Sequence, residues 1–284
     1  MAGRSVTEPS RPVSYRQLRG AVSSLGLLNR PVCIHASLRS FGAITGGADA
    51  LIDTFLDEHC TIVVPTFSWE GFAVPPPDKT DMRPPRNGWN DSSPWEKPLG
   101  PPRIYDATSD TLDDDMGVLP ARVLAHTVSV RGNHPLVSFA AVGPLAGVLI
   151  KAQDLTEPFA PLEALSERGG VVALMGVGLR RMTLLHLAEQ QAGRTLLRRW
   201  ALGQNRSATL VAVGGCSEGF DNFNSVLARI ERQAQIGSSL WRVFEANLAL
   251  EAATAAIVTK PSITHCRQLC VRCDDAVSGG PILD

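Results

Sequence analysis

Cysteine is scarce in this chain, with six residues among 284. That is too few for the dense cross-links of small secreted domains, so disulfides are not expected to hold the fold together. No uninterrupted apolar run approaches 18 residues, which argues against a membrane-spanning helix. Residues 1–12 contain no apolar core and therefore no secretory signal is expected. These absences predict a cytoplasmic globular protein that does not associate with membranes.

An excess of charge of either sign is also missing. The chain has 27 Lys and Arg against 28 Asp and Glu, and its formal net charge is −1. A general nucleic-acid binder needs a basic face, so no nucleic-acid partner is expected. Hydrophobic residues reach 44%, enough for a substantial core. A chain of this length fits one large α/β domain or two small ones.

Strand-like and helix-like segments alternate along the chain. Short apolar runs at 31–34 and 61–67 flank a segment with helical apolar spacing after Gly46-Gly47. Strand, helix and strand in such close succession form a βαβ unit, which implies a parallel pair. A capping box at 14–17 opens an earlier helix. Further strands are expected at 136–143, 171–175 and 208–213, and further helices at 116–125, 183–193, 225–235 and 248–258.

The composition changes between residues 71 and 103, where nine of the 20 prolines lie. We expect an irregular insertion there and not a domain boundary, because no second core is framed by it. Residues 1–12 are expected to be disordered. Residues 13–284 are expected to form a single layered α/β domain with a central mixed sheet and a cysteine-containing C-terminal segment.

The strongest chemical pattern is a pair of polar residues, His186 and Glu189, in an otherwise apolar helix. Residues three apart share one face of a helix. A carboxylate beside an imidazole holds one tautomer and leaves the other ring nitrogen available as a general base. The alternative is a surface ion pair on a half-exposed helix, since this spacing is common.

A second pattern follows the first strand, where His35-Ala-Ser-Leu-Arg-Ser-Phe-Gly42 precedes a helix. Its Ser37, Arg39 and Ser40 side chains, with backbone N–H groups, suit a phosphate or pyrophosphate. A plain strand-to-helix turn is the alternative. His134, at the mouth of another strand, is either a structural hydrogen-bonding group or a catalyst. Five aspartates form a solvated turn or a negative surface for a polycation: Asp106, Asp110, Asp113, Asp114 and Asp115.

The cysteines are unevenly placed. Three cluster near the end of the chain after His265, and a fourth lies about 50 residues earlier: Cys216, Cys266, Cys270 and Cys273. Four thiolates would complete a structural zinc tetrahedron, and His265 could replace Cys266 as a ligand. Free thiols are the alternative, because the spacing is less regular than that of paired CxxC knuckles. Cys33 and Cys60 are typical of small core residues.

Taken in order, these segments resemble the aminoglycoside 3-N-acetyltransferase family over residues 14–190. The resemblance rests on six segments: 35–42, 64–69, 107–109, 116–117, 134–139 and 174–189. It implies the family's layered α/β fold, with acetyl-CoA as cosubstrate. It also implies acetyl transfer to an aminoglycoside antibiotic, at the 3-amine of the 2-deoxystreptamine ring, with resistance as the outcome. Acylation of a different amine, or a catalytically inactive zinc-stabilised binding module, are the competing interpretations.

The resemblance further implies that His186 and Glu189 form a catalytic dyad. Coenzyme A would be bound by residues of several loops: Ser37, Leu38, Arg39, Thr66, Thr108, Ser109 and Gly117. Ammonium groups of the antibiotic would be held by acidic residues, for which the candidates are Glu70, Asp78, Glu218 and Asp221. The chain departs from the family pattern in 179–182, where Arg180 and Arg181 add two positive charges ahead of the dyad. Both would repel a polycation if they faced the pocket.

Overall fold

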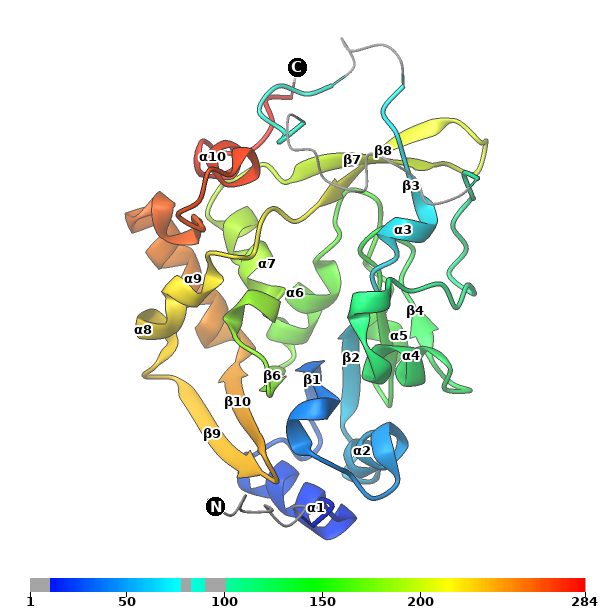
Figure 1. Cartoon of the computed structure of the whole chain (residues 1–284), viewed down its shortest axis with the longest axis vertical. Coiled ribbons are helices and arrows are strands. Elements are labelled where there is room, and N and C mark those ends of the chain that lie inside the picture. Colours follow the sequence, from blue (N-terminus) through cyan, green and yellow to red (C-terminus); the bar gives the residue numbers. More distant parts are fainter. Residues whose placement is uncertain (1–10, 78–82, 90–100, 284) are drawn as a thin grey trace, which may run out of the picture.

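The computed structural model describes residues 11–77, 83–89 and 101–283. A seven-stranded mixed sheet lies at the centre of the fold (Figure 1). Three strands at its centre are parallel: β2 (Thr61–Pro65), β1 (Pro31–Ala36) and β6 (Val171–Met175). Four antiparallel strands extend the two sides: β4 (Val130–Arg131) and β5 (Phe139–Val142) next to β2, and β10 (Ser239–Glu245) and β9 (Glu231–Ile236) next to β6. The predicted mixed sheet and its parallel βαβ pair are confirmed.

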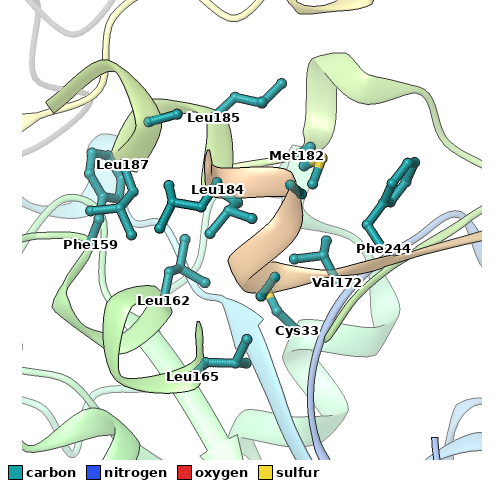
Figure 2. Close-up of a cluster of buried hydrophobic side chains, with 14 of the residues drawn as sticks. Cys33, Phe159, Leu162, Leu165, Val172, Met182, Leu184, Leu185, Leu187 and Phe244 are labelled. Atoms are coloured by element: carbon teal, nitrogen blue, oxygen red, sulfur yellow. The ribbon is translucent and has the colours of Figure 1, made fainter. Parts of the chain in front are cut away.

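Two helical layers cover the sheet, because successive side chains of a buried strand point to opposite faces. In β1, Val32 and Ile34 pack with α1 (Tyr15–Ser24), α2 (Gly47–Asp57) and α4 (Val118–Leu124). Cys33 points to the other face, which is covered by α5 (Ala146–Ile150), α6 (Ala160–Glu167), α7 (Leu184–Gln191) and α9 (Ala246–Thr259). Figure 2 shows leucines of α6 and α7 converging over Cys33 and Val172. This packing fixes α7 against the carboxyl half of the sheet.

A second, three-stranded antiparallel sheet joins β3 (Ala73–Val74), β7 (Leu197–Leu202) and β8 (Ala208–Val213). It begins inside the expected insertion, directly after α3 (Trp69–Phe72). Residues 83–89 also contact this sheet, since Asn87 Oδ1 accepts the Arg198 N–H at 2.7 Å and Asn87 Nδ2 donates to the Arg198 carbonyl at 2.9 Å. Parts of the proline-rich segment are therefore built into the fold. Of residues 1–12, which were expected to be disordered, 1–10 lie outside the described part of the chain.

The helix predicted at 225–235 is wrong. Only α8 (Asn224–Leu227) is helical, and the chain then continues as β9. Arg242 on β10 donates from Nε to Glu231 Oε1 at 2.5 Å and from Nη2 to Oε2 at 2.8 Å. Pairing with β10 along six residues thus overrides the local helical preference of a largely polar segment.

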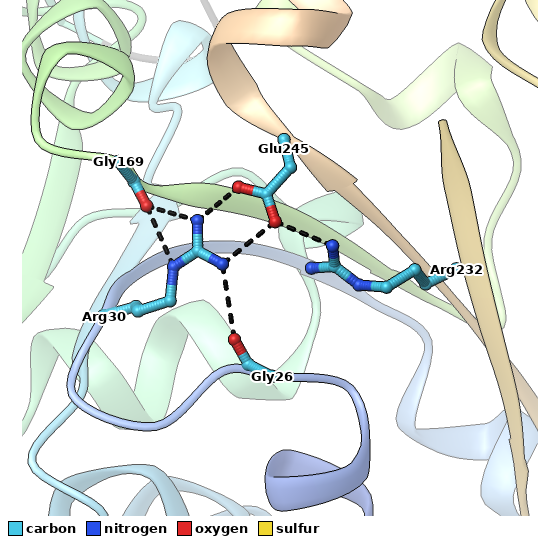
Figure 3. Close-up of polar contacts among 5 residues, drawn as sticks. All are labelled: Gly26, Arg30, Gly169, Arg232 and Glu245. Carbon is cyan, nitrogen blue, oxygen red and sulfur yellow. Dashed lines mark hydrogen bonds and ion pairs between the residues drawn. The ribbon is translucent and has the colours of Figure 1, made fainter. Parts of the chain in front are cut away.

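A cluster of charged groups fastens the edge of the sheet at which β1 and β6 begin (Figure 3). The Arg30 guanidinium donates to the Gly169 carbonyl at 2.9 Å and to Glu245 Oε1 at 2.9 Å, while Arg232 donates to the same Oε1 at 2.7 Å. Arg30 thereby holds the pKa of the Glu245 carboxyl below its usual value. The cluster joins the starts of the two parallel strands β1 and β6 to the end of antiparallel β10. The ends of β1 and β6 lie at the opposite side of the sheet.

Among the described residues, no helix is both long enough and apolar enough to cross a bilayer. The helices that cover the sheet are short, and the longest of those named here is α9 with 14 residues.

Candidate active site

A cavity of about 550 Å³ opens where β1, β2 and β6 end. Its wall includes His35 and Ala36 from β1, Pro65 from β2, and Val177, which follows β6. Open α/β sheets bind their ligands at the carboxyl ends of parallel strands, and this volume is typical of small-molecule sites. The cavity therefore lies at the edge of the sheet opposite the Arg30 cluster.

His186 and Glu189 meet at the side of this cavity as the sequence predicted. Both are in α7, and His186 Nδ1 lies 2.8 Å from Glu189 Oε2. Their exposed fractions are 8% and 4%, which contradicts the alternative of a surface pair. His186 also lines the cavity. Because Nδ1 is engaged by the carboxylate, Nε2 is the nitrogen left to exchange a proton there.

Arg194, which the sequence analysis missed, binds the carboxylate of the pair. Its Nη1 donates to Glu189 Oε1 at 2.7 Å and to Thr264 Oγ1 at 2.8 Å, and its Nη2 donates to the Pro261 carbonyl at 2.6 Å. Gly193 has a φ of +87°, which ends the helix and turns Arg194 back toward it. The Glu189 carboxylate is thus fixed by a partner on each oxygen. A basic residue next to a helix-ending glycine was the available signal.

Aromatic rings and a glycine confine the imidazole. The ring of Phe159 stacks on that of His186 at 5.7 Å and 17°, and the Phe220 ring lies 4.7 Å away. A Cβ added to Gly214 would come within 2.7 Å of His186 Cδ2 and 2.9 Å of Nε2. Only glycine therefore fits at 214 with the imidazole in this position.

The loop after β1 forms another wall. Ser37, Leu38 and Arg39 all line the cavity, and Leu38 begins the 3-10 helix η1 (Leu38–Phe41). Ser40, expected as a phosphate ligand, instead donates to the Ser37 carbonyl at 2.6 Å, and its Oγ is hydrogen-bonded to Ser239 Oγ at 2.7 Å. The loop is held in place by Ser40, which leaves Ser37 and Arg39 beside the cavity.

Of the other predicted coenzyme A contacts, Gly117 lines the cavity and three residues lie outside its lining. Thr66 is fully buried and its hydroxyl donates to the Ser138 carbonyl at 3.1 Å. Thr108 closes a turn with Asp106, and Ser109 donates from Oγ to Thr111 at 3.0 Å. Arg131, which the sequence analysis did not select, binds this region through several oxygens: Thr66 O, Ser109 O, Thr111 O, Ser68 Oγ and Ser138 Oγ.

The cavity lining includes residues of the acidic run, but none of the described acidic residues that were selected as antibiotic ligands. Asp113, Asp114 and Asp115 line it, the last two within η4 (Asp114–Met116). Asp113 accepts the backbone N–H groups of Trp69 and Glu70, each at 2.9 Å, and burial raises the pKa of its carboxyl. Asp113 therefore supports the wall, whereas the exposed Asp114 and Asp115 carboxylates face solvent at its rim.

The four acidic residues selected as antibiotic ligands do not lie together. Glu218 and Asp221 both pair with Arg180, the latter at 3.3 Å. The side chain of Glu70 is exposed and lies outside the cavity lining. Asp78 lies outside the described residues. The structure thus brings two of the four candidates to the cavity, through Arg180.

Arg180 and Arg181, both in η5 (Leu179–Arg181), line the cavity. This is the position in which they were expected to repel a polycation. Each is paired, since Arg181 Nη1 lies 3.3 Å from Asp115 Oδ2 and Arg180 binds the two carboxylates named above. Side chains this exposed, at 53% and 62%, form weak ion pairs that exchange partners readily. The rim consequently presents charges of both signs instead of a uniform positive field.

Two buried histidines flank the site as neutral groups. Burial lowers the pKa of His35 to about 3, with the charge of Arg181 acting in the same direction. Burial lowers the pKa of His134 to about 4. His134 Nδ1 accepts the N–H groups of Leu136 and Val137, and Nε2 lies 2.9 Å from the Ala212 carbonyl. His134 thus fits the structural interpretation, since both ring nitrogens are bound to backbone.

His134 should make the protein lose stability in acid. Its native pKa lies below the unfolded value, so the unfolded chain binds the proton first and stability falls as pH drops from about 6.5 toward 4. Between pH 7 and 5 this group should cost about 2 kcal/mol of unfolding free energy. Urea titrations at both pH values should show a smaller loss in His134→Gln than in wild type. The exposed-site control His59→Asn should behave as wild type, and an equal loss in all three would contradict the assignment.

The cysteines fall into the two predicted groups. Cys33 and Cys60 are fully buried core residues. The Sγ atoms of the other four all lie within 4.8 Å of one another: Cys216, Cys266, Cys270 and Cys273. His265 is directed elsewhere, because its Nε2 lies 2.8 Å from Asp274 Oδ1 and its Nδ1 accepts the Arg267 N–H.

The chain is similar in sequence to known enzymes. Aminoglycoside N(3)-acetyltransferase IX of Micromonospora chalcea and VII of Streptomyces paromomycinus are each 33% identical over 188 residues. These matches cover 64% of this chain but only 63% and 62% of the two relatives. The chain therefore spans less than two thirds of the curated relatives it matches.

Among solved structures, the aminoglycoside acetyltransferase AAC(3)-Xa superposes with a TM-score of 0.69 at 26% identity, over 87% of this chain and 93% of that one. The family model for aminoglycoside 3-N-acetyltransferases matches residues 33–257. That range begins within β1, includes His186 and Glu189 on α7, and ends within α9. By sequence over most of its length, and by fold, this chain belongs to the aminoglycoside 3-N-acetyltransferase family.

Proposed function

We propose that the protein transfers the acetyl group of acetyl-CoA to an amino group of an aminoglycoside antibiotic, at the 3-amine of the 2-deoxystreptamine ring. The observation that carries this proposal is the buried His186–Glu189 pair beside a cavity at the carboxyl ends of the parallel strands. Family membership supports the reaction class. The acceptor and the position rest on the names of the relatives.

The chemistry requires a base, because a protonated amine has no lone pair to attack a thioester. His186 Nε2 takes that proton, and Glu189 stabilises the resulting imidazolium while holding Nδ1–H toward itself. The amine then attacks the thioester carbonyl, and as the carbon–sulfur bond breaks the imidazolium gives its proton to the sulfur of coenzyme A. The neutral imidazole that this regenerates takes the second proton from the nitrogen of the new amide and releases it to solvent. Arg194 keeps the Glu189 side chain oriented throughout.

Coenzyme A carries phosphates, which suit the loop after β1. Arg39 supplies a guanidinium, and Ser37 and Leu38 border the same part of the cavity as Gly117. We assign these four residues to direct contacts with the cosubstrate. Thr66 and Ser109 are assigned an indirect part, because their carbonyls accept hydrogen bonds from Arg131. Thr108 is assigned an indirect part too, since it closes the turn with Asp106 that precedes Ser109.

A polycationic acceptor suits the acidic part of the rim. Asp114 and Asp115 are exposed beside the cavity, and Glu218 and Asp221 surround Arg180. An ammonium group approaching this rim can replace Arg180 or Arg181 in their exposed ion pairs, since such pairs are weak. The four carboxylates outnumber the two arginines, so the rim keeps a net negative charge toward a polycation.

Arg39→Ala should raise the KM for acetyl-CoA more than it lowers kcat. Contacts to a remote phosphate are equally strong in the ground state and the transition state, so their loss appears in KM. Steady-state kinetics with each substrate varied in turn measure this split. Arg11→Ala, at an exposed position outside the cavity lining, is the matched control. A raised KM for the antibiotic alone would place Arg39 in the acceptor site.

Binding of the cosubstrate tests the proposal without requiring turnover. Acetyl-CoA at 100 times its dissociation constant should stabilise the native protein by about 2.7 kcal/mol, seen as a rise in Tm. Arg39→Ala should need more acetyl-CoA for the same rise, and His186→Ala should respond as wild type does. No shift with saturating acetyl-CoA in the wild-type protein would overturn the proposed function in favour of a binding module.

A further inference from the structure

Four cysteine sulfurs converge at a place that the proposed reaction does not use. Cys216 follows β8, while Cys266, Cys270 and Cys273 come from the segment that leads into α10 (Val271–Val277). Their Sγ atoms lie within 4.8 Å of one another, and all six cysteines of the chain are free thiols. In a tetrahedral zinc site with Zn–S of about 2.3 Å, ligand sulfurs are about 3.8 Å apart. A small contraction would therefore close the cluster around one ion.

The ligand set is complete without histidine. Cys216 and Cys273 are buried, and Cys266 and Cys270 are half-buried. His265 is bound to Asp274 and to the Arg267 N–H, so it is not available to replace a cysteine. Four thiolates select a soft, tetrahedral ion and leave it no open coordination position, which is typical of structural zinc.

One of the two segments that supply these cysteines touches His186, and the other touches Arg194, which is bound to Glu189. Cys216 lies between Gly214, whose backbone abuts the imidazole, and Ser217, which lines the cavity. Cys266 closely follows η7 (Pro261–Thr264), where the Pro261 carbonyl and the Thr264 hydroxyl accept from Arg194. The cluster therefore lies between the loop that contacts His186 and the segment that binds Arg194, the partner of Glu189.

The same two segments are in direct backbone contact. A Cβ added to Gly219 would come within 2.2 Å of the Thr264 carbonyl oxygen and 2.6 Å of the His265 carbonyl carbon. Asn222 Nδ2 donates to the carbonyls of Ile263 at 2.8 Å and His265 at 3.1 Å. Neutral hydrogen bonds alone hold this junction weakly, whereas a metal bound to both segments would fix their separation.

We propose that Cys216, Cys266, Cys270 and Cys273 bind one Zn²⁺, which clamps the 214–222 loop to the 261–273 segment and so fixes His186 and Arg194 in place. The ion takes no part in proton transfer or acetyl transfer. This inference is independent of which amine is acetylated, because it concerns the position of the dyad.

Elemental analysis of full-length protein purified without added metal should find one zinc per chain, and X-ray absorption should find four sulfur ligands at about 2.3 Å. Cys270→Ser, at a half-buried position, should lower the zinc content severalfold. Cys60→Ser, at a buried cysteine outside the cluster, should keep one zinc per chain. A wild-type zinc content near zero, whether with four titratable thiols or with disulfides in the cluster, would overturn the proposal.

The clamp has its own test, which does not depend on activity. Removing zinc with a chelator should lower the Tm and speed amide hydrogen exchange in 214–222 and 261–273, while exchange in β1 and β2 stays unchanged. Zinc added back should restore the slow exchange. Zinc loss without faster exchange in either segment would overturn the clamp, and neither result bears on whether acetyl-CoA is the donor.

Discussion

His186→Ala should lower kcat for acetyl transfer by roughly 10²–10⁴-fold and leave the affinity for acetyl-CoA nearly unchanged. In the proposed mechanism, loss of the imidazole removes the base that deprotonates the amine, while the loop around Arg39 is untouched. Steady-state kinetics and equilibrium binding of acetyl-CoA measure the two effects separately. Glu189→Gln should cost less, since a neutral amide still orients the ring but no longer stabilises its protonated form.

His59→Asn is the matched control for this result, because His59 is exposed and does not line the cavity. Its kcat should equal that of the wild type. If His186→Ala kept more than about a tenth of wild-type kcat, His186 would not be the general base. A large loss of acetyl-CoA affinity in His186→Ala would instead indicate that the imidazole supports the cosubstrate pocket.

Glu189→Leu should destabilise the fold by about 3–5 kcal/mol, with a fall in Tm of roughly 10 °C. The substitution leaves the Arg194 guanidinium, whose side chain is 7% exposed, without its carboxylate. An unpaired buried charge costs much more than the pair contributes. Urea unfolding monitored by tryptophan fluorescence measures the loss.

A double variant separates this cause from a general packing defect. Glu189→Leu combined with Arg194→Leu removes both charges, so it should recover a large part of the stability that either single variant loses. A double variant less stable than both singles, with additive losses, would show that the two residues are not coupled. Kinetics of the same proteins would be poor in every case, because the dyad is lost.

The sequence predicted the part of the fold that is encoded by continuous apolar runs. β1, β6 and β8 are mostly apolar segments, with His35 in β1 and Thr209 in β8 as the exceptions, and their positions were confirmed to within two residues. β9 and β7 were not predicted, because polar residues interrupt both. β9 is an outer strand of the large sheet, and β7 pairs with β8 in the small one. Both strands form because of tertiary contacts, which cannot be read from the local sequence pattern.

The candidate site divides in the same way. His186 and Glu189 lie on one helix, so their meeting followed from a spacing of three. Arg194 meets Glu189 only because the chain reverses at Gly193, and its other partners on η7 are about 70 residues away. Arg131 and Asp113 likewise act across long sequence separations. Contacts of this kind depend on how separate segments pack, which explains why the sequence analysis missed them.

The most direct test of the proposed function is an acetylation assay with acetyl-CoA and a panel of aminoglycosides with and without a free 3-amine. Products are identified by mass spectrometry and the modified nitrogen by NMR. We predict a single acetyl group on the 3-amine, and no product from antibiotics in which that amine is absent or blocked. Acetylation at another nitrogen would contradict the assigned position. Failure to acetylate any member of the panel, in protein that binds acetyl-CoA, would show that the acceptor is a different amine.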